Sequence, residues 1–131
     1  MVDQKKKLLE INNSEEFLEI INCDSRKDKL ILVDFFAEWC GPCLKLGNFL
    51  HKLIEADKDK QYDNVLFLKV NIDNDECCHL VDRFQIQSIP RVVMLKNKKV
   101  VSDITGCDPN KILDDLKKCS VKTNVKSKRK D

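Results

Sequence analysis

An apolar stretch that runs directly into two closely spaced cysteines constrains this chain more than any other feature. Residues 30–36 are rich in branched side chains and contain one charged residue, Asp34, which predicts a buried strand. Cys40 and Cys43 follow in a Cys-Gly-Pro-Cys motif. Apolar residues then recur every three to four positions, which predicts an amphipathic helix ending near Asp57. Two thiols therefore lie where a buried strand passes into a helix.

The predicted position of Cys40 favours the thiolate form of its side chain. The first N–H groups of a helix lack intrahelical partners, and together with the helix dipole they stabilise a nearby negative charge. Such surroundings lower a cysteine pKa from about 8.5 to between about 3.5 and 7.5. The thiolate is the species that attacks disulfides, and Cys43, one turn further on, can displace the product. Gly41 leaves the approach to Cys40 open, and Pro42 suits an early helical position because it lacks an N–H.

Three segments of the chain resemble the thioredoxin family. Residues 33–43 (Val-Asp-Phe-Phe-Ala-Glu-Trp-Cys-Gly-Pro-Cys) resemble its active-site segment. The resemblance continues at residues 68–73 (Leu-Lys-Val-Asn-Ile-Asp) and 88–90 (Ser-Ile-Pro) and covers roughly residues 7–119. Together these segments are more specific than a Cys-x-x-Cys motif alone. The resemblance implies an α/β thioredoxin fold over residues 1–120, a mixed five-stranded sheet flanked by four helices, and a protein-disulfide reductase.

The order of elements predicted along the chain, βαβαβαββα, is compatible with that fold. Apolar patterning predicts strands at residues 7–11, 30–36, 65–70, 91–95 and 100–104, and helices beginning near residues 13, 43, 75 and 108. Asn13 and Glu16 have the spacing of a capping box, although Ser14 is an equally good cap. In the third predicted helix we expect Cys78 and Val81 to face inward.

The composition limits the setting in which the chain acts. Its 131 residues suffice for one domain, and a net charge of +2 does not indicate a nucleic-acid partner. No run approaches the roughly 18 apolar residues of a membrane span, and residues 1–10 lack the apolar core of a signal peptide. Seven cysteines cannot all pair within one chain. We therefore expect a reducing compartment, the cytoplasm, with a trimmed targeting segment as the alternative. The chain is also expected to be a monomer.

Asp34 is a charged residue within an otherwise apolar strand. On a half-exposed strand it would be solvated, but the branched neighbours favour burial, and a buried carboxyl has a raised pKa. The resemblance implies that Asp34 exchanges a proton with Cys43. It also implies that Lys69, on the next strand, modulates this proton, although Lys69 could instead be a surface lysine at a sheet edge.

Pro90 precedes the fourth predicted strand. Its position alone favours a trans peptide bond, because only about 5% of X–Pro bonds are cis. The resemblance implies the opposite, a cis bond that leaves the backbone of Ile89 free to pair with an extended substrate segment. Trp39, Gly41 and Pro42 would then line a shallow docking surface beside Ile89.

The resemblance also implies partners. Disulfide-containing client proteins would be the substrates, and a thioredoxin reductase would return electrons from NADPH, with no cofactor bound to the chain itself. Two other functions stay open: a disulfide oxidant or isomerase, and an adaptor whose thiols are passive. The Gly-Pro dipeptide of the motif argues against the first, because Gly-His is typical of the isomerases.

Five further cysteines lie outside the motif. Cys40 and Cys43 could be half of a zinc site completed by residues 77–79 (Cys-Cys-His), but that spacing does not match the regular pairs of closed zinc sites. Cys77 and Cys78 would form only a strained ring, so we expect one inward-facing and one exposed thiol. The other three are interpreted as small buried or surface residues: Cys23, Cys107 and Cys119.

Some residues depart from the family pattern. Arg91 follows the proline where threonine is usual, Leu44 stands where a basic residue is common, and Lys98 replaces the glycine of the last hairpin. Arg91 could add positive charge near the thiolate and select acidic substrates, or it could point away. Residues 121–131 contain five basic side chains, and we expect a disordered, solubilising tail, the alternative being a weak anchor for acidic partners.

Overall fold

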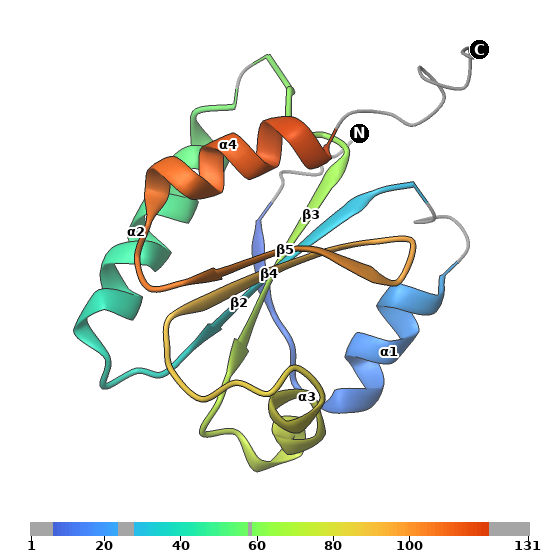
Figure 1. Cartoon of the computed structure of the whole chain (residues 1–131), viewed down its shortest axis with the longest axis vertical. Coiled ribbons are helices and arrows are strands. Elements are labelled where there is room, and N and C mark those ends of the chain that lie inside the picture. Colours follow the sequence, from blue (N-terminus) through green and yellow to red (C-terminus); the bar gives the residue numbers. More distant parts are fainter. Residues whose placement is uncertain (1–6, 24–27, 58, 121–131) are drawn as a thin grey trace, which may run out of the picture.

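Five strands form one mixed sheet in the order β1-β3-β2-β4-β5 (Figure 1). The computed structural model describes residues 7–23, 28–57 and 59–120, so the predicted tail lies outside the described residues. The strands are β1 (Leu8–Glu10), β2 (Leu30–Phe36), β3 (Val65–Asn71), β4 (Arg91–Lys96) and β5 (Lys99–Thr105). β3 runs parallel to both β1 and β2, whereas β4 runs antiparallel to β2 and β5 antiparallel to β4. The predicted mixed sheet is confirmed.

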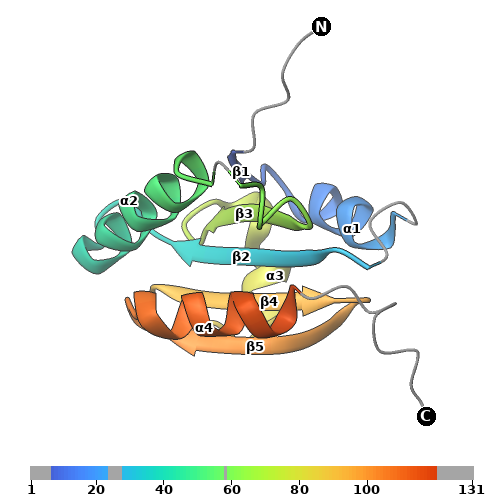
Figure 2. The same ribbon diagram turned by 90° about the horizontal axis from the view of Figure 1, so that it is seen from above.

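Helices cover both faces of this sheet, as Figures 1 and 2 show from two directions. The helices are α1 (Ser14–Asn22), α2 (Gly41–Glu55), α3 (Cys78–Arg83) and α4 (Pro109–Cys119), and a 3₁₀ turn, η2 (Asp75–Cys77), precedes α3. α2 and α4 lie on one face, and α1 and α3 lie on the other. No helix among the described residues is long and apolar enough to cross a membrane.

The central strand β2 is buried on both faces, which explains its apolar sequence. Its side chains alternate between the two faces. Leu30 and Leu32 enter the core under α2 and α4, whereas Ile31, Val33 and Phe35 enter the core under α1 and α3. Asp34 shares the direction of Leu32 and so points toward the α2 side of the sheet.

The start of α1 confirms Asn13 as the cap. Its side-chain oxygen accepts the backbone N–H of Glu16 at 2.8 Å, and the Glu16 carboxylate accepts the N–H of Asn12 at 2.7 Å. Ser14 has another role, because its hydroxyl donates to the carbonyl of Glu76 at 3.2 Å.

The region of α3 corrects one prediction. Cys77, not Cys78, is the inward-facing thiol, and Cys78 is exposed. The residues before α3 form a 3₁₀ turn with about three residues per turn, which shifts the buried face by one position, so Cys77 and Leu80 share it. The Cys77 thiol donates to the carbonyl of Ile11 at 3.6 Å. The expectation of one inward and one exposed thiol is confirmed, with the two residues exchanged.

The β4–β5 hairpin closes through Asn97 and Lys98. Both residues have left-handed backbones, with φ of 53° and 69°. A two-residue hairpin turn of this kind favours glycine or asparagine, so Lys98 occupies a position that a lysine adopts at some cost.

Candidate active site

The two motif cysteines lie at the N-terminus of α2 and form a disulfide. Their Cα atoms are 5.2 Å apart. Cys40 is the N-cap residue, and its Sγ accepts the backbone N–H of Cys43 at 3.2 Å. Both side chains are more than nine-tenths buried. The predicted placement at a strand–helix junction is confirmed, and the helix N-terminus directs a donor at the sulfur of Cys40.

Exposed residues surround this disulfide on one side. The indole of Trp39 is 71% exposed, and its Nε1 donates to Oδ2 of Asp73 at 2.7 Å. Gly41 and Pro42 are also exposed, and Ile89 packs against the buried cluster formed by Ala37 and the two cysteines. Asp73 is a residue of the site that the motif alone does not predict, although it ends the 68–73 segment and so follows β3 at the same end of the sheet as the motif.

The peptide bond between Ile89 and Pro90 is cis, as the family resemblance implies. Pro90 is buried, and its carbonyl accepts the N–H of Gly106 at 2.8 Å. Gly106 has a φ of 86°, a conformation that residues with a Cβ rarely adopt. The start of β4 and the end of β5 are therefore joined directly beside the docking residues.

Asp34 is buried, as the apolar neighbours predict, with 2% of its surface exposed. Its Oδ1 has no hydrogen-bond partner among the described residues. Burial raises the pKa of this carboxyl to about 7, and the positive charge of Lys69 opposes the rise without cancelling it.

Lys69 is in register with Asp34 on the neighbouring strand. β3 lies between β1 and β2, so the alternative of a lysine at a sheet edge is wrong. Its Nζ lies 5.2 Å from the centre of the Phe36 ring, a cation–π contact.

Arg91 does not present an unpaired charge to the disulfide. Its guanidinium forms an ion pair with Asp103 on β5, with Nη2 2.8 Å from Oδ2. The hydrogen bond with Asp103 raises the pKa of Arg91 and lowers that of Asp103. Of the two alternatives, the arrangement agrees with a side chain directed away from the thiols.

The other cysteines are dispersed over the fold. Burial raises the pKa of Cys77, and nearby glutamates raise it further, so this thiol resists ionisation. Cys78 and Cys107 are exposed, and burial raises the pKa of the half-buried Cys119. Within residues 7–23, 28–57 and 59–120, no group of three or more His, Cys, Asp or Glu side chains is arranged to hold a metal ion.

Taken together, these features define a site for dithiol–disulfide exchange. Two cysteines at a helix N-terminus lie in a cluster with the residue that precedes a cis-proline, and a buried carboxyl with a pKa of about 7 lies on β2, the strand that leads into them.

Comparison with known proteins identifies the family to which this site belongs. The thioredoxin family model matches residues 8–118. Human thioredoxin is 32% identical over 103 residues, which are 79% of this chain and 90% of that protein. Spinach chloroplast thioredoxin f (short form) has a crystal structure that aligns with a TM-score of 0.77 and 30% identity, covering 92% of this chain and 100% of the other.

One similar protein is not itself a thioredoxin. A peptide-N(4)-(N-acetyl-beta-glucosaminyl)asparagine amidase of Caenorhabditis briggsae is 33% identical over 109 residues, which are 83% of this chain but 17% of that protein. The chain belongs to the thioredoxin family. It is a protein-disulfide reductase that acts by thiol–disulfide exchange, and disulfide-containing proteins are its substrates.

Proposed function

We propose that Cys40 is the attacking thiol and Cys43 the resolving thiol of this reaction. The Cys40 thiolate attacks one sulfur of a client disulfide, the client S–S bond breaks, and the other client sulfur leaves as a thiolate. The Cys43 thiolate then attacks the Cys40 sulfur of the mixed disulfide and releases the second client thiolate. Two electrons pass from the protein dithiol to the client, and Cys40 and Cys43 end as a disulfide.

The observation that carries this assignment is the hydrogen bond from the Cys43 N–H to the Cys40 sulfur. This donor and the other unpaired N–H groups of the first helical turn stabilise negative charge on Cys40. Cys43 lies inside the helix and is the more buried of the two, so it is suited to act second.

Asp34 accepts the proton of Cys43 in the proposed second step. A carboxyl whose pKa is about 7 is partly ionised at neutral pH and can both accept and release a proton. Strand alternation directs Asp34 toward α2, whose buried side chains include Cys43. Lys69 moderates the pKa of Asp34 and so adjusts the pH range of this transfer.

Client segments dock in an extended conformation along the backbone of Ile89. The cis bond at Pro90 and the packing of Ile89 against the cysteines support this placement. The exposed side chain of Trp39, with Gly41 and Pro42, provides the rest of the surface.

The oxidised chain requires a source of electrons. The proposed source is NADPH, through a thioredoxin reductase, with no cofactor held by this chain. The proposed setting is the cytoplasm, where the chain acts as a monomer in redox homeostasis.

The direction of the reaction is tested by the reduction potential of the Cys40–Cys43 pair at equilibrium with glutathione. Thioredoxins as a class have potentials of about −270 mV, and protein disulfide isomerase about −180 mV, a gap of about 4 kcal/mol. We expect a value near the first. A value near the second would make the protein an oxidant or isomerase, and the absence of a transition would leave only an adaptor.

Trapping with client protein assigns the two thiols. We expect Cys43→Ser to accumulate a mixed disulfide with oxidised insulin, detected by mass, and Cys40→Ser to accumulate none. Accumulation on Cys40→Ser instead would reverse the order of attack.

A further inference from the structure

The residue after the cis-proline makes the most extensive ion-pair contact of the described side chains near the site. Arg91 begins β4, and its side chain is 17% exposed. Its Nε and Nη2 donate to the two carboxylate oxygens of Asp103 at 2.5 and 2.8 Å. This parallel two-bond geometry is one that lysine cannot reproduce, because an ammonium lacks the planar fork.

A third donor of the same guanidinium reaches a different part of the chain. Nη1 of Arg91 donates to the carbonyl of Gln85 at 3.3 Å. Gln85 follows α3 by two residues and has a left-handed backbone with φ of 53°. The guanidinium therefore joins three segments: the chain after α3, the first residue of β4, and β5.

The segment between these contacts carries Ile89. At its beginning, the N–H groups of Gln85 and Ile86 donate to carbonyls within α3 at 3.1 and 3.0 Å. At its end, the Pro90 carbonyl accepts from Gly106 at 2.8 Å. Among the described residues, none is hydrogen-bonded to residues 87–89. The path of this segment thus depends on the packing of Ile89 and on how its two ends are held.

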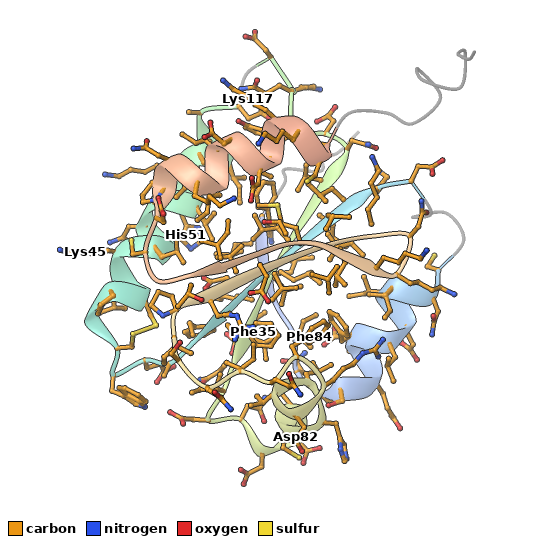
Figure 3. The ribbon with its side chains drawn as sticks, viewed as in Figure 1. Phe35, Lys45, His51, Asp82, Phe84 and Lys117 are labelled. Atoms are coloured by element: carbon orange, nitrogen blue, oxygen red, sulfur yellow. A yellow bond between two sulfur atoms is a disulfide. The ribbon has the colours of Figure 1, made fainter. Side chains whose placement is uncertain are left out.

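Packing of the residue after α3 fixes the position at which this segment begins. Figure 3 shows Phe84, the residue directly after α3, beside Phe35 of β2, and their ring centres are 5.7 Å apart. Phe84 also meets Phe17 of α1 edge-to-face at 5.8 Å. One end of the segment is therefore anchored in the core, and Arg91 ties this anchored end to β5.

We propose that Arg91 is a positioning residue for client docking. Its two bonds to Asp103 orient the guanidinium so that the third donor holds the Gln85 carbonyl, and this sets the path of the chain that presents the Ile89 backbone to an extended client. The inference rests on the proposed docking along Ile89. It assigns Arg91 a role through geometry, in contrast to recruitment of acidic clients by an unpaired charge.

The test uses pre-reduced protein in single-turnover reactions with two disulfides. Under the proposed docking, insulin binds as an extended chain along Ile89, whereas dithiodipyridine is too small to span the docking surface. For Arg91→Lys and for Asp103→Asn we expect the half-saturating insulin concentration to rise about tenfold. The limiting rate, the reaction with dithiodipyridine and the reduction potential should stay unchanged.

The double variant and a control separate this role from others. Because the two residues act as a unit, Arg91→Lys combined with Asp103→Asn should cost no more than either alone. Ser102→Ala removes a contact on the opposite face of β5 and should leave the insulin half-saturation unchanged. The order parameters of the 87–89 amides, measured by ¹⁵N relaxation, should fall in both single variants and not in Ser102→Ala.

Three results would contradict the proposal, and each has a different meaning. Equal losses on insulin and dithiodipyridine, or no loss on either, would overturn the positioning role. Tighter insulin binding by Asp103→Asn would instead indicate that an unpaired Arg91 recruits acidic groups. If the unmodified protein reduces neither disulfide, the proposed function fails first, which separates that outcome from failure of Arg91 alone.

Discussion

Two aspartates of this molecule expose little surface but lie at different depths, and their pKa values are shifted in opposite directions. Asp34 on β2 is 2% exposed and Asp115 on α4 is 7% exposed. Asp115 accepts the hydroxyl of Ser102 at 2.6 Å and the ammonium of Lys111 at 3.0 Å. These hydrogen bonds, that of Ser102 first, lower the pKa of Asp115, whereas burial raises the pKa of Asp34 to about 7.

The difference shows that a small exposed surface alone does not decide the charge of a carboxyl, because depth and nearby donors also act on it. Donors directed at Asp115 stabilise its ionised form, and the bond from Ser102 also joins α4 to the edge strand β5. Asp34 has Lys69 near it but no donor on Oδ1 among the described residues, so its neutral form competes at neutral pH. We therefore interpret Asp115 as a stabilising group and Asp34 as a proton carrier.

Replacing either aspartate by asparagine should give the largest effects. Asp34→Asn should lower the activity, whereas Asp115→Asn should lower the stability. Asp34→Asn removes the proton acceptor for Cys43, so we expect insulin reduction at pH 7 to slow by about 10- to 100-fold. The same change removes an unsatisfied buried carboxylate, so the free energy of unfolding at pH 8 should rise by about 1–3 kcal/mol. Activity assays and urea titrations check both. A variant with full activity would remove Asp34 from the mechanism.

Asp115→Asn is the matched control, and it should lower the stability without changing the activity. It weakens the charge-assisted bonds to Ser102 and Lys111, so we expect a loss of about 1–2 kcal/mol in unfolding free energy. Insulin reduction at a temperature where the variant is folded should equal that of the unmodified protein. Loss of activity without loss of stability would contradict the interpretation of Asp115 as a stabilising group.

The two carboxyls should also change the free energy of unfolding with pH in opposite directions. The folded pKa of Asp34 lies above its unfolded value of 3.8, so the folded chain binds the proton more tightly and stability falls as the pH rises from about 4 to 7. The folded pKa of Asp115 is lowered, so its contribution is present above the unfolded value and is lost as the pH falls through the folded one.

Urea unfolding at a series of pH values measures these slopes. Asp34→Asn should flatten the decline between pH 4 and 7, and Asp115→Asn should flatten the decline on the acid side. An unchanged slope between pH 4 and 7 in Asp34→Asn would mean that the carboxyl titrates normally in the folded chain.

Lys69→Met should give the smallest effect. The charge of Lys69 lowers the pKa of Asp34, so its removal should shift the pH dependence of insulin reduction to higher pH. The half-maximal pH of the single-turnover rate measures this shift. A shift to lower pH would contradict the electrostatic role assigned to Lys69.

The contrast between these residues also explains what the sequence could predict. The burial of Asp34 was predictable because apolar residues flank it on a strand that is covered on both faces. The hydrogen-bonded burial of Asp115 was not predictable, because its partner Ser102 lies on another element and the sequence around Asp115 does not indicate that contact. The partner of Arg91 was missed for the same reason, because Asp103 meets it only through strand pairing.

Local geometry and family resemblance account for two other outcomes. The phase of the buried face at Cys77 depends on a 3₁₀ turn, which a helical period of 3.6 residues does not predict. The cis bond at Pro90 followed from resemblance, whereas its position alone argued for trans.

The proton-carrier role of Asp34 is tested most directly by its pKa in the oxidised protein, followed by the ¹³C chemical shift of its carboxyl carbon, with Asp115 as the internal reference. We expect a midpoint of about 7 for Asp34 and one below the ordinary aspartate range for Asp115. A midpoint for Asp34 near the ordinary value of about 4 would mean that the carboxyl is ionised throughout the working range, and Asp34 could not then carry the proton of Cys43.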